Sequence, residues 1–262
     1  MTNAALHVAR TGLDAQNTKM QVIANNLANV NTTGFKKDRA NFQALAYQQL
    51  IAAGAASDSE NKFATGLSLG TGVAIAGTSR IDTQGTLTST GSALDLAIEG
   101  GGYFQLQRSD GTIGYTRDGN FSRTAEGTLV NSDGLPLIPQ IQVPDGTTSL
   151  TIGNDGTVSA TISGQSAPTN LGQIELANFA NASGLQSVGG NVLIETAASG
   201  APQVGIAGLD GRGTIKQGSL EGSNVNIVEE LVDMIETQRA YEVNSKMIKS
   251  TDEMLQYVNQ QL

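Results

Sequence analysis

Apolar residues recur every seven positions at the two ends of the 262-residue chain. Near the start, the repeat consists of Leu6, Leu13, Met20 and Leu27, each followed three residues later by Ala9, Gln16, Ile23 and Val30. This a/d heptad pattern predicts an amphipathic helix with one polar interruption, at Gln16. Asn31-Thr32-Thr33-Gly34 follows, and since Asn and Gly tolerate the left-handed conformation that ends helices, we expect the helix to stop near Val30.

The other end of the chain repeats the pattern over a longer stretch. Ile227, Met234, Tyr241, Ile248, Leu255 and Leu262 are spaced by seven, with Leu231, Ile235, Met247, Met254 and Val258 alongside. Asn226 is placed to cap this helix, with Glu229 three positions later as a capping-box partner. Such periodicity is also typical of ordinary amphipathic helices on a globular core. The position of the stripes at the two ends, around a middle of different character, favours a pair of helices instead.

The middle of the chain, residues 66–220, has the character of antiparallel β-structure. Six Asp-Gly dipeptides punctuate it, at Asp110, Asp118, Asp133, Asp145, Asp155 and Asp210. Such dipeptides supply the positive φ of tight hairpin turns, whereas the spacing of a calcium-binding loop is absent. Between them lie the strand candidates 103–107, 149–152 and 157–162.

Residues 36–65 form a connector that begins with charged residues and becomes rich in Ala, Ser and Gly. We interpret it as an extended or partly helical segment that is mobile in the isolated chain. The expected fold class is therefore α+β, with N- and C-terminal helices paired as a coiled-coil-like domain around an inserted, mainly antiparallel β domain. The expected division is residues 1–35 for the first helix, 36–65 for the connector, 66–220 for the β-rich domain and 221–262 for the second helix.

Composition narrows the functional classes. A net charge of −9 argues against nucleic acid and anionic membranes as partners, because phosphate contacts require Lys and Arg. With no cysteine there is neither a disulfide framework nor thiol catalysis. No apolar run reaches the roughly 18 residues of a membrane span, and residues 1–13 lack the apolar region of a signal peptide.

The sequence offers no convincing catalytic group. His7 is the only histidine and has no partner of a nucleophilic triad. Gly70-Thr-Gly72 and Gly100-Gly-Gly102 lack the remaining spacing of a phosphate-binding loop. A carboxylate pair drawn from Asp95, Glu99 and Asp118 would resemble a glycosidase, but the chain has no Trp to line a sugar cleft. We therefore expect no enzyme and no catalytic, cofactor or metal site.

Two long motifs carry a family resemblance. Residues 24–37, Ala-Asn-Asn-Leu-Ala-Asn-Val-Asn-Thr-Thr-Gly-Phe-Lys-Lys, resemble the N-terminal signature of flagellar rod and hook proteins, and residues 223–255 resemble their C-terminal signature. Gly100-Gly-Gly-Tyr-Phe104 and Tyr115-Thr-Arg-Asp-Gly-Asn-Phe121 match in the interior. The motif residues implied by the resemblance are Asn25, Asn26, Asn29, Gly34, Phe35, Asn224, Asn226, Arg239, Tyr241 and Glu242.

Within this family, the length of the chain and its 46–65 segment resemble the distal-rod branch. The resemblance implies a structural subunit that polymerises into a rigid tubular drive shaft and transmits torque from motor to hook. The implied polymer interface comprises Leu6, Leu13, Met20, Ile23, Leu27, Val30, Ile227, Leu231, Met234, Tyr241, Ile248 and Leu255. The implied connector contacts are Tyr47, Leu50, Ile51 and Phe63.

The implied partners are further copies of the chain, the proximal rod and hook proteins, the P- and L-ring proteins and the flagellar export apparatus. The implied location is the basal body, across the periplasm to the outer membrane, reached without a cleaved signal peptide. Two alternatives stay open. One is another axial subunit, of the proximal rod or the hook, and the other is a secreted β-rich adhesin with coiled-coil ends.

Overall fold

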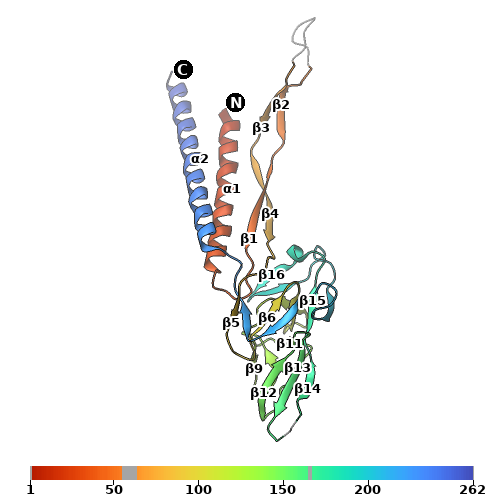
Figure 1. Cartoon of the computed structure of the whole chain (residues 1–262). Helices are drawn as coiled ribbons and strands as arrows, with labels where there is room; N and C mark the ends of the chain where they lie inside the picture. Colours follow the sequence, from red (N-terminus) through yellow and green to blue (C-terminus); the bar gives the residue numbers. More distant parts are fainter. Residues whose placement is uncertain (1, 55–63, 165–166, 262) are drawn as a thin grey trace. The chain divides into compact units, whose positions relative to one another are not determined.

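A computed structural model of the chain describes residues 2–54, 64–164 and 167–261 (Figure 1). The chain divides into two compact units. The helical unit comprises Met1–Leu27, Asp38–Ser79 and Asn226–Leu262, and the β-rich unit comprises Ala28–Lys37 and Arg80–Val225. The structure is therefore α+β, with a helix near each end and a mostly antiparallel β region between them.

The helical unit contains the two helices and a two-stranded ribbon. Its elements are α1 (Thr2–Ala28), β1 (Asp38–Ala44), β2 (Tyr47–Ile51), β3 (Leu67–Gly70), β4 (Val73–Arg80) and α2 (Ile227–Gln261). In the ribbon, β1 pairs with β4, and β2 pairs antiparallel with β3 from Tyr47 opposite Gly70 to Ile51 opposite Leu67. No helix in the described part of the chain is long and apolar enough to span a membrane.

Helix α1 lies between α2 and the ribbon (Figure 1). On one side, Asn26 Nδ2 donates to Glu230 Oε2 at 3.2 Å, and a Cβ atom on Gly12 would lie 3.1 Å from Asn244 Nδ2. Asn26 and Gly12 are as far apart in sequence as Glu230 and Asn244, so the helices run antiparallel in one register. On the ribbon side, the Val73 N–H donates to Thr11 Oγ1 at 3.4 Å.

The connector boundary expected from the sequence needs correction. We placed residues 66 onward in the β-rich domain, but β3 and most of β4 belong to the helical unit. The reason is strand pairing: β2 and β1 find their hydrogen-bond partners in β3 and β4, so the connector and the segment after it fold as one ribbon.

The two helices begin and end close to their expected bounds. α1 ends at Ala28, so the 1–35 segment also includes the turn that follows the helix. α2 begins at Ile227, and Glu221 at the start of the expected helical segment lies in strand β20 instead. The predicted cap is confirmed, because Asn226 Oδ1 accepts a hydrogen bond from the Val228 N–H at 3.0 Å.

The β-rich unit consists of many short strands. They are β5 (Leu87–Ser89), β6 (Leu96–Glu99), β7 (Tyr103–Gln107), β8 (Ile113–Thr116), β9 (Ser122–Arg123), β10 (Leu129–Val130), β11 (Leu137–Ile138), β12 (Thr147–Ile152), β13 (Thr157–Ile162), β14 (Thr169–Gln173), β15 (Glu175–Asn178), β16 (Gln186–Gly189), β17 (Val192–Ile194), β18 (Gln203–Ile206), β19 (Thr214–Gln217) and β20 (Ser219–Glu221), with a 3₁₀ turn at Ala182–Gly184. The strands predicted at 103–107 and 157–162 coincide with β7 and β13.

The largest sheet has seven strands, in the order β16-β17-β8-β7-β15-β18, with β11 pairing with β7. Its central strand β7 alternates between two apolar clusters. Phe104 and Leu106 face the larger one, where the Phe104 ring meets Phe121 edge to face at 5.2 Å. Tyr103 faces the smaller one, with Tyr115 and Phe179. Alternating side chains of a strand point to opposite faces, so β7 joins both clusters.

In five of the six predicted Asp-Gly turns, the glycine has the positive φ that was expected. Gly111, Gly134, Gly146, Gly156 and Gly211 have φ between +77° and +87°. Asp118-Gly119 is different, and the hairpin prediction is wrong there. Gly119 is needed because a Cβ atom would overlap the Leu96 carbonyl oxygen.

A buried ion cluster joins segments of the β-rich unit that are distant in sequence. Glu221 accepts from Lys36 Nζ at 2.6 Å, from Arg117 Nη1 at 3.0 Å and from the Gly85 N–H at 2.9 Å. The side chains of the three charged residues are almost entirely buried. Burial by itself would raise the pKa of Glu221, but Arg117 and Lys36 outweigh this effect and hold the pKa below its usual range.

Asn224 makes a second set of links among the same segments. Its Oδ1 accepts from the Lys37 N–H at 2.7 Å, and its Nδ2 donates to the Ile81 and Thr83 carbonyls. The Ile81 N–H in turn donates to the Lys37 carbonyl at 2.9 Å. Residues 34–37, 81–86 and 219–224 are therefore held together at one place in the β-rich unit.

We expect Glu221→Ala to lower the free energy of unfolding by about 3–5 kcal/mol, because two buried cations would lose their counter-charge. Urea unfolding of the full chain, followed by circular dichroism, measures this change. The matched control is Asp145→Ala, which breaks the Arg123–Asp145 pair where Asp145 is 91% exposed and should cost at most about 1 kcal/mol. If both variants lower the free energy of unfolding by the same amount, the buried ion cluster does not stabilise the unit more than an exposed ion pair does.

The lowered pKa of Glu221 also predicts a pH dependence. A carboxyl whose folded-state pKa lies below its unfolded value of 4.5 contributes stability above pH 4.5 and loses it as pH falls through the folded-state pKa. Glu221→Gln lacks this titration. The stability difference between the natural chain and Glu221→Gln should therefore shrink as pH falls below 4.5. A difference that stays constant down to pH 2 would contradict the prediction.

Candidate assembly surface

The first part of α2 presents an exposed apolar stripe. It consists of Ile227, Val228, Leu231, Val232 and Ile235, which we call the outer stripe. Each of these side chains is at least 42% exposed, and Val228 reaches 70%. Their spacing of one and four residues places them on one side of the helix. Five adjacent exposed aliphatic side chains mark a surface that another chain would cover.

The side of α2 that faces α1 is polar. Glu230, Thr237, Asn244 and Thr251 recur every seven residues there. Glu230 is 4% and Thr237 1% exposed, and Asn244 and Thr251 are half-buried. Each threonine hydroxyl donates to the carbonyl four residues earlier, Thr237 to Asp233 at 2.6 Å and Thr251 to Met247 at 2.8 Å. The contact within one chain therefore leaves the apolar residues of α2 largely free.

The predicted interface residues of α2 fall into two groups. Ile227, Leu231 and Tyr241 are exposed, whereas Met234 and Ile248 are half-buried beside the polar face. The side chain of Leu255 lies outside the described residues. The exposed group is available to another copy of the chain, and its role in an interface stays a prediction.

The predicted interface residues near the start of the chain are less accessible. Ile23 is 4% exposed, and the rest are half-buried, namely Leu6, Leu13, Met20, Leu27 and Val30. For the residues within α1, this follows from the place of the helix between α2 and the ribbon, which leaves only part of its circumference uncovered (Figure 1), whereas Val30 lies beyond the end of the helix.

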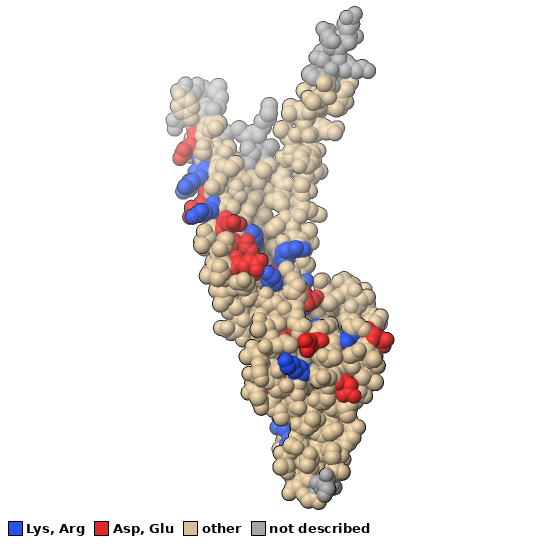
Figure 2. All heavy atoms as spheres, viewed as in Figure 1, with Lys and Arg blue, Asp and Glu red and all other residues tan. Residues whose placement is uncertain are grey.

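The ribbon is the second exposed apolar surface. Tyr47 is 64% and Leu50 56% exposed, and Ile51 is half-buried. Phe63, the fourth predicted connector contact, lies outside the described residues. Residues 40–57 and 63–79 contain no charged side chain, and the ribbon is correspondingly free of charge colours over most of its length in Figure 2. Natural sheets usually protect exposed edges with charges, so a long uncharged ribbon indicates a contact surface.

The motif residues near α1 have structural roles. Asn26 is buried, Asn29 Oδ1 accepts from Thr32 Oγ1 at 3.1 Å, and Asn25 is exposed. Gly34 has φ +68°, and a Cβ atom there would lie 2.6 Å from the Arg117 backbone. Phe35 contributes its carbonyl, which accepts from the Asn224 N–H at 3.4 Å. The contacts of Asn26, Asn29 and Gly34 explain why amide and glycine residues stand at these three positions.

The motif residues of α2 divide between a cap and an exposed surface. Asn226 caps the helix, as described above. Arg239, Tyr241 and Glu242 are exposed, and the structure does not bring them together with the amide residues near α1. Sequence reasoning missed Glu230 and Glu221. The available signal for Glu230 was a polar heptad, 230-237-244-251, running beside the apolar one.

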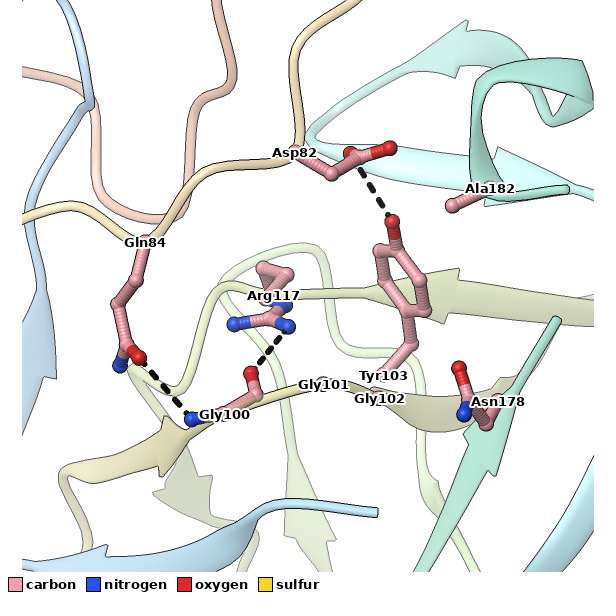
Figure 3. Close-up of a pocket in the computed structure, with 9 residues that line it drawn as sticks. All are labelled: Asp82, Gln84, Gly100, Gly101, Gly102, Tyr103, Arg117, Asn178 and Ala182. Carbon is pink, nitrogen blue, oxygen red and sulfur yellow. Dashed lines mark hydrogen bonds between the residues drawn. The ribbon is translucent and has the colours of Figure 1, made fainter. Parts of the chain in front are cut away.

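The β-rich unit contains a cavity with several polar groups in its lining. This cavity of about 290 Å³ lies between the Asp82–Gln84 segment, the Gly100–Tyr103 turn and Arg117 (Figure 3). Several of its polar groups bind one another: the Tyr103 hydroxyl donates to Asp82 at 3.1 Å, and Arg117 Nη2 donates to the Gly100 carbonyl at 2.6 Å. Gln84 Oε1 accepts from the Gly100 N–H. These bonds occupy the Tyr103 hydroxyl, the Gln84 carbonyl oxygen and one Arg117 nitrogen, whereas the buried Arg117 Nε has no hydrogen-bond partner among the described residues.

Metal binding has no support in the described residues either, where no group of three or more His, Cys, Asp or Glu is placed to hold an ion. The outer stripe and the ribbon are the exposed apolar surfaces that stand out in the described residues.

Three segments of the chain match known families. Residues 6–36 match the flagella basal body rod protein family, residues 97–160 match the flagellar hook protein FlgE/F/G D1 domain, and residues 216–261 match the C-terminal region of flagellar basal body rod FlgEFG proteins. The outer stripe thus lies within one matched segment and most of α1 within another.

Whole-chain relatives extend these matches. The flagellar basal-body rod protein FlgG of Buchnera aphidicola subsp. Acyrthosiphon pisum is 50% identical over 256 residues, covering 98% of each chain. In Caulobacter vibrioides, FlgG is 46% identical over 98% of each chain. The flagellar basal-body rod protein FlgF of the same organism is 36% identical, over 93% of this chain and 92% of its own. Of these two Caulobacter vibrioides proteins, FlgG is therefore more similar to the chain than FlgF is.

The outer stripe predicts the effect of one added charge. Val228→Asp places a carboxylate in the first turn of α2, where the helix dipole favours it, so the helix should stay intact. Covering that carboxylate in an interface would cost several kcal/mol, so self-association should weaken at least tenfold. Sedimentation velocity across a concentration series measures the association, and circular dichroism the helix content.

Thr148→Asp is the control, since it adds the same charge at an exposed position of the β-rich unit. If the Val228→Asp chain associates at the same concentration as the natural chain, the outer stripe is not covered in the assembly.

Proposed function

The chain belongs to the family of flagellar basal-body rod proteins, and we propose that it is the structural subunit of the distal rod, polymerising into a rigid tube that transmits torque from the motor to the hook. The observation that carries the proposal is the outer stripe. A single chain leaves five adjacent aliphatic side chains of α2 uncovered, and these side chains lie within the residues that match the rod family.

The outer stripe explains why the subunit polymerises. Two identical stripes facing each other would close into a dimer, so in a polymer the stripe contacts a different surface on the next copy. Such a heterologous contact does not close on itself and generates an open helical array. Fully burying an aliphatic side chain contributes about 1.5–3 kcal/mol, and the contact recurs at every subunit.

In this polymer, the helices of neighbouring copies complete the coiled-coil-like packing that a single chain leaves incomplete. The predicted interface residues take part from two sides. The exposed side chains of Ile227, Leu231 and Tyr241 on α2 contact the neighbouring copy at the centre of the interface. The half-buried predicted residues of α1 contact it at the edge of the interface. Torque transmission then requires no chemistry, because many equivalent interfaces share the load.

The ribbon makes the polymer straight. Within the described residues, β2 and β3 pair only with each other, which leaves their outer edges open. Exposed Tyr47 and Leu50 and the lack of charge suit contact with a neighbouring copy. A contact of this kind prevents the sliding between subunits that a bending tube requires.

The partners follow from the place of a rod in the flagellum. The rod associates with the other rod components and the hook within the basal body. We further propose that the chain crosses the periplasm toward the outer membrane inside the P and L rings, and that the flagellar export apparatus delivers it without cleavage of a signal peptide. Family membership supports these partners.

Two alternatives compete with the distal rod. A proximal rod or hook subunit would share the helices and much of the β-rich unit, and the higher identity to FlgG than to FlgF in one organism favours the distal rod. An adhesin with coiled-coil ends would form discrete oligomers. Electron microscopy of the concentrated protein distinguishes them, since straight tubes support the rod.

The ribbon provides a test of straightness. The Leu45 N–H donates to the Gly72 carbonyl at 2.9 Å, so residues 46–71 can be replaced by a two-residue Asn-Gly turn without disturbing β1 and β4. We expect this variant to fold and assemble but to form curved rods, seen by electron microscopy of isolated basal bodies.

The matched control is Ser68→Thr in the full-length ribbon, which keeps both strands and the exposed Tyr47 and Leu50 side chains and should leave the rods straight. Straight rods from the shortened variant would show that the ribbon is not what makes the polymer straight.

A further inference from the structure

The contact between α1 and α2 is unusual in placing buried polar groups where the two helices meet. Asn26 is 2% and Glu230 4% exposed, and their side chains form a hydrogen bond of 3.2 Å. Apolar contacts are non-directional and permit sliding along a helix, whereas a buried hydrogen bond is satisfied in one alignment.

The Asn26 amide is fully used by its neighbours. Its Oδ1 accepts from the Asp38 N–H at 3.0 Å, and its Nδ2 donates to the Asp38 carbonyl at 2.9 Å. The two bonds to the Asp38 backbone fix the orientation of the amide and leave one N–H, which donates to Glu230. Asn26 therefore joins the last turn of α1, the start of β1 and the first turn of α2.

The remaining polar positions of α2 do not distinguish one alignment from another. Thr237, Asn244 and Thr251 follow Glu230 at intervals of seven, so a shift of one heptad replaces one small polar side chain by another. Glu230 has the longest side chain of these four residues, and its carboxylate accepts from Asn26. A shifted α2 would place Thr237 at that point, and the Asn26 N–H would lose its carboxylate.

We propose that the Asn26–Glu230 hydrogen bond specifies the register of the two helices, with Glu230 acting as a positioning residue. Single buried polar residues specify register in coiled coils in the same way. The register of the two helices is a property of a single chain, so a test of the register does not depend on the distal-rod function.

Disulfide trapping tests the register directly, because the chain has no cysteine of its own. A Cβ atom on Gly12 would lie 3.1 Å from Asn244 Nδ2, so Gly12→Cys with Asn244→Cys reports the observed register. Gly12→Cys with Thr237→Cys or Thr251→Cys reports shifts of one heptad, each about 10 Å away along the helix. Purified, dilute full chain is oxidised, and the internally cross-linked band is followed on denaturing gels.

In the natural background, we expect the 12–244 pair to cross-link at least tenfold faster than either shifted pair. Glu230→Leu should reduce this preference below about twofold, and Glu230→Gln should preserve it because the Gln carbonyl oxygen still accepts from Asn26. The matched control is Glu236→Leu, which makes the same change at an exposed position of α2 and should keep the tenfold preference.

Retention of the tenfold preference in Glu230→Leu overturns the proposal, as does the absence of that preference in the natural background. If circular dichroism shows that Glu230→Leu loses helix, Glu230→Thr takes its place. That variant makes position 230 resemble its heptad neighbours and leaves the helix polar. The same loss of preference is expected, and its retention overturns the proposal equally.

Discussion

Glu221 carries a constraint on which the rest of the β-rich unit depends. Its carboxylate has almost no access to water, so the free energy of its hydration must be replaced by Lys36, Arg117 and the Gly85 N–H. These three groups belong to segments far apart in the sequence. Meeting the needs of one carboxylate therefore brings the first, middle and last segments of the unit together, and Asn224 reinforces the arrangement through backbone groups of the same segments.

The helical unit uses polarity differently. In most amphipathic helices, the apolar side faces the rest of the same chain and the polar side faces water. Here α2 turns Glu230 and Thr237 toward α1 and leaves the outer stripe exposed. In the proposed rod, Glu230 on the polar face sets the alignment of α2 on α1, and the outer stripe contacts another copy. Separating these two properties on opposite sides of one helix suits a subunit that must be aligned before it is incorporated.

The sequence predicted the elements better than their relationships. Heptad spacing located both helices, and Asp-Gly turns with alternating strands located β7 and β13, because these signals are local. The spacing could not tell which side of α2 faces its own chain, since apolar periodicity is the same for an internal and an external partner. The ribbon was only half recognised, because pairing of β1 with β4 is a long-range property.

The candidate surface was similarly predictable in part. Ile227, Leu231 and Tyr241 were expected from their spacing and are exposed. Glu230 and Glu221 were not expected, since a carboxylate in a sequence normally indicates a solvated position and only the fold reveals its buried partners. Gly119 illustrates the same limit, because its requirement arises from the approach of Leu96 and not from the turn that the dipeptide suggested.

The hydrogen bond from the Asn224 N–H to the Phe35 carbonyl has a consequence for how such subunits diversify. It brings the two ends of a long stretch of chain to one point, so everything between them is a closed loop. The entropy of closing a loop grows only with the logarithm of its length, and each doubling costs roughly 0.6 kcal/mol. Strands can thus be gained or lost inside the loop with little change in the free energy of closing it. Subunits whose β regions differ greatly in size can therefore keep the same helices.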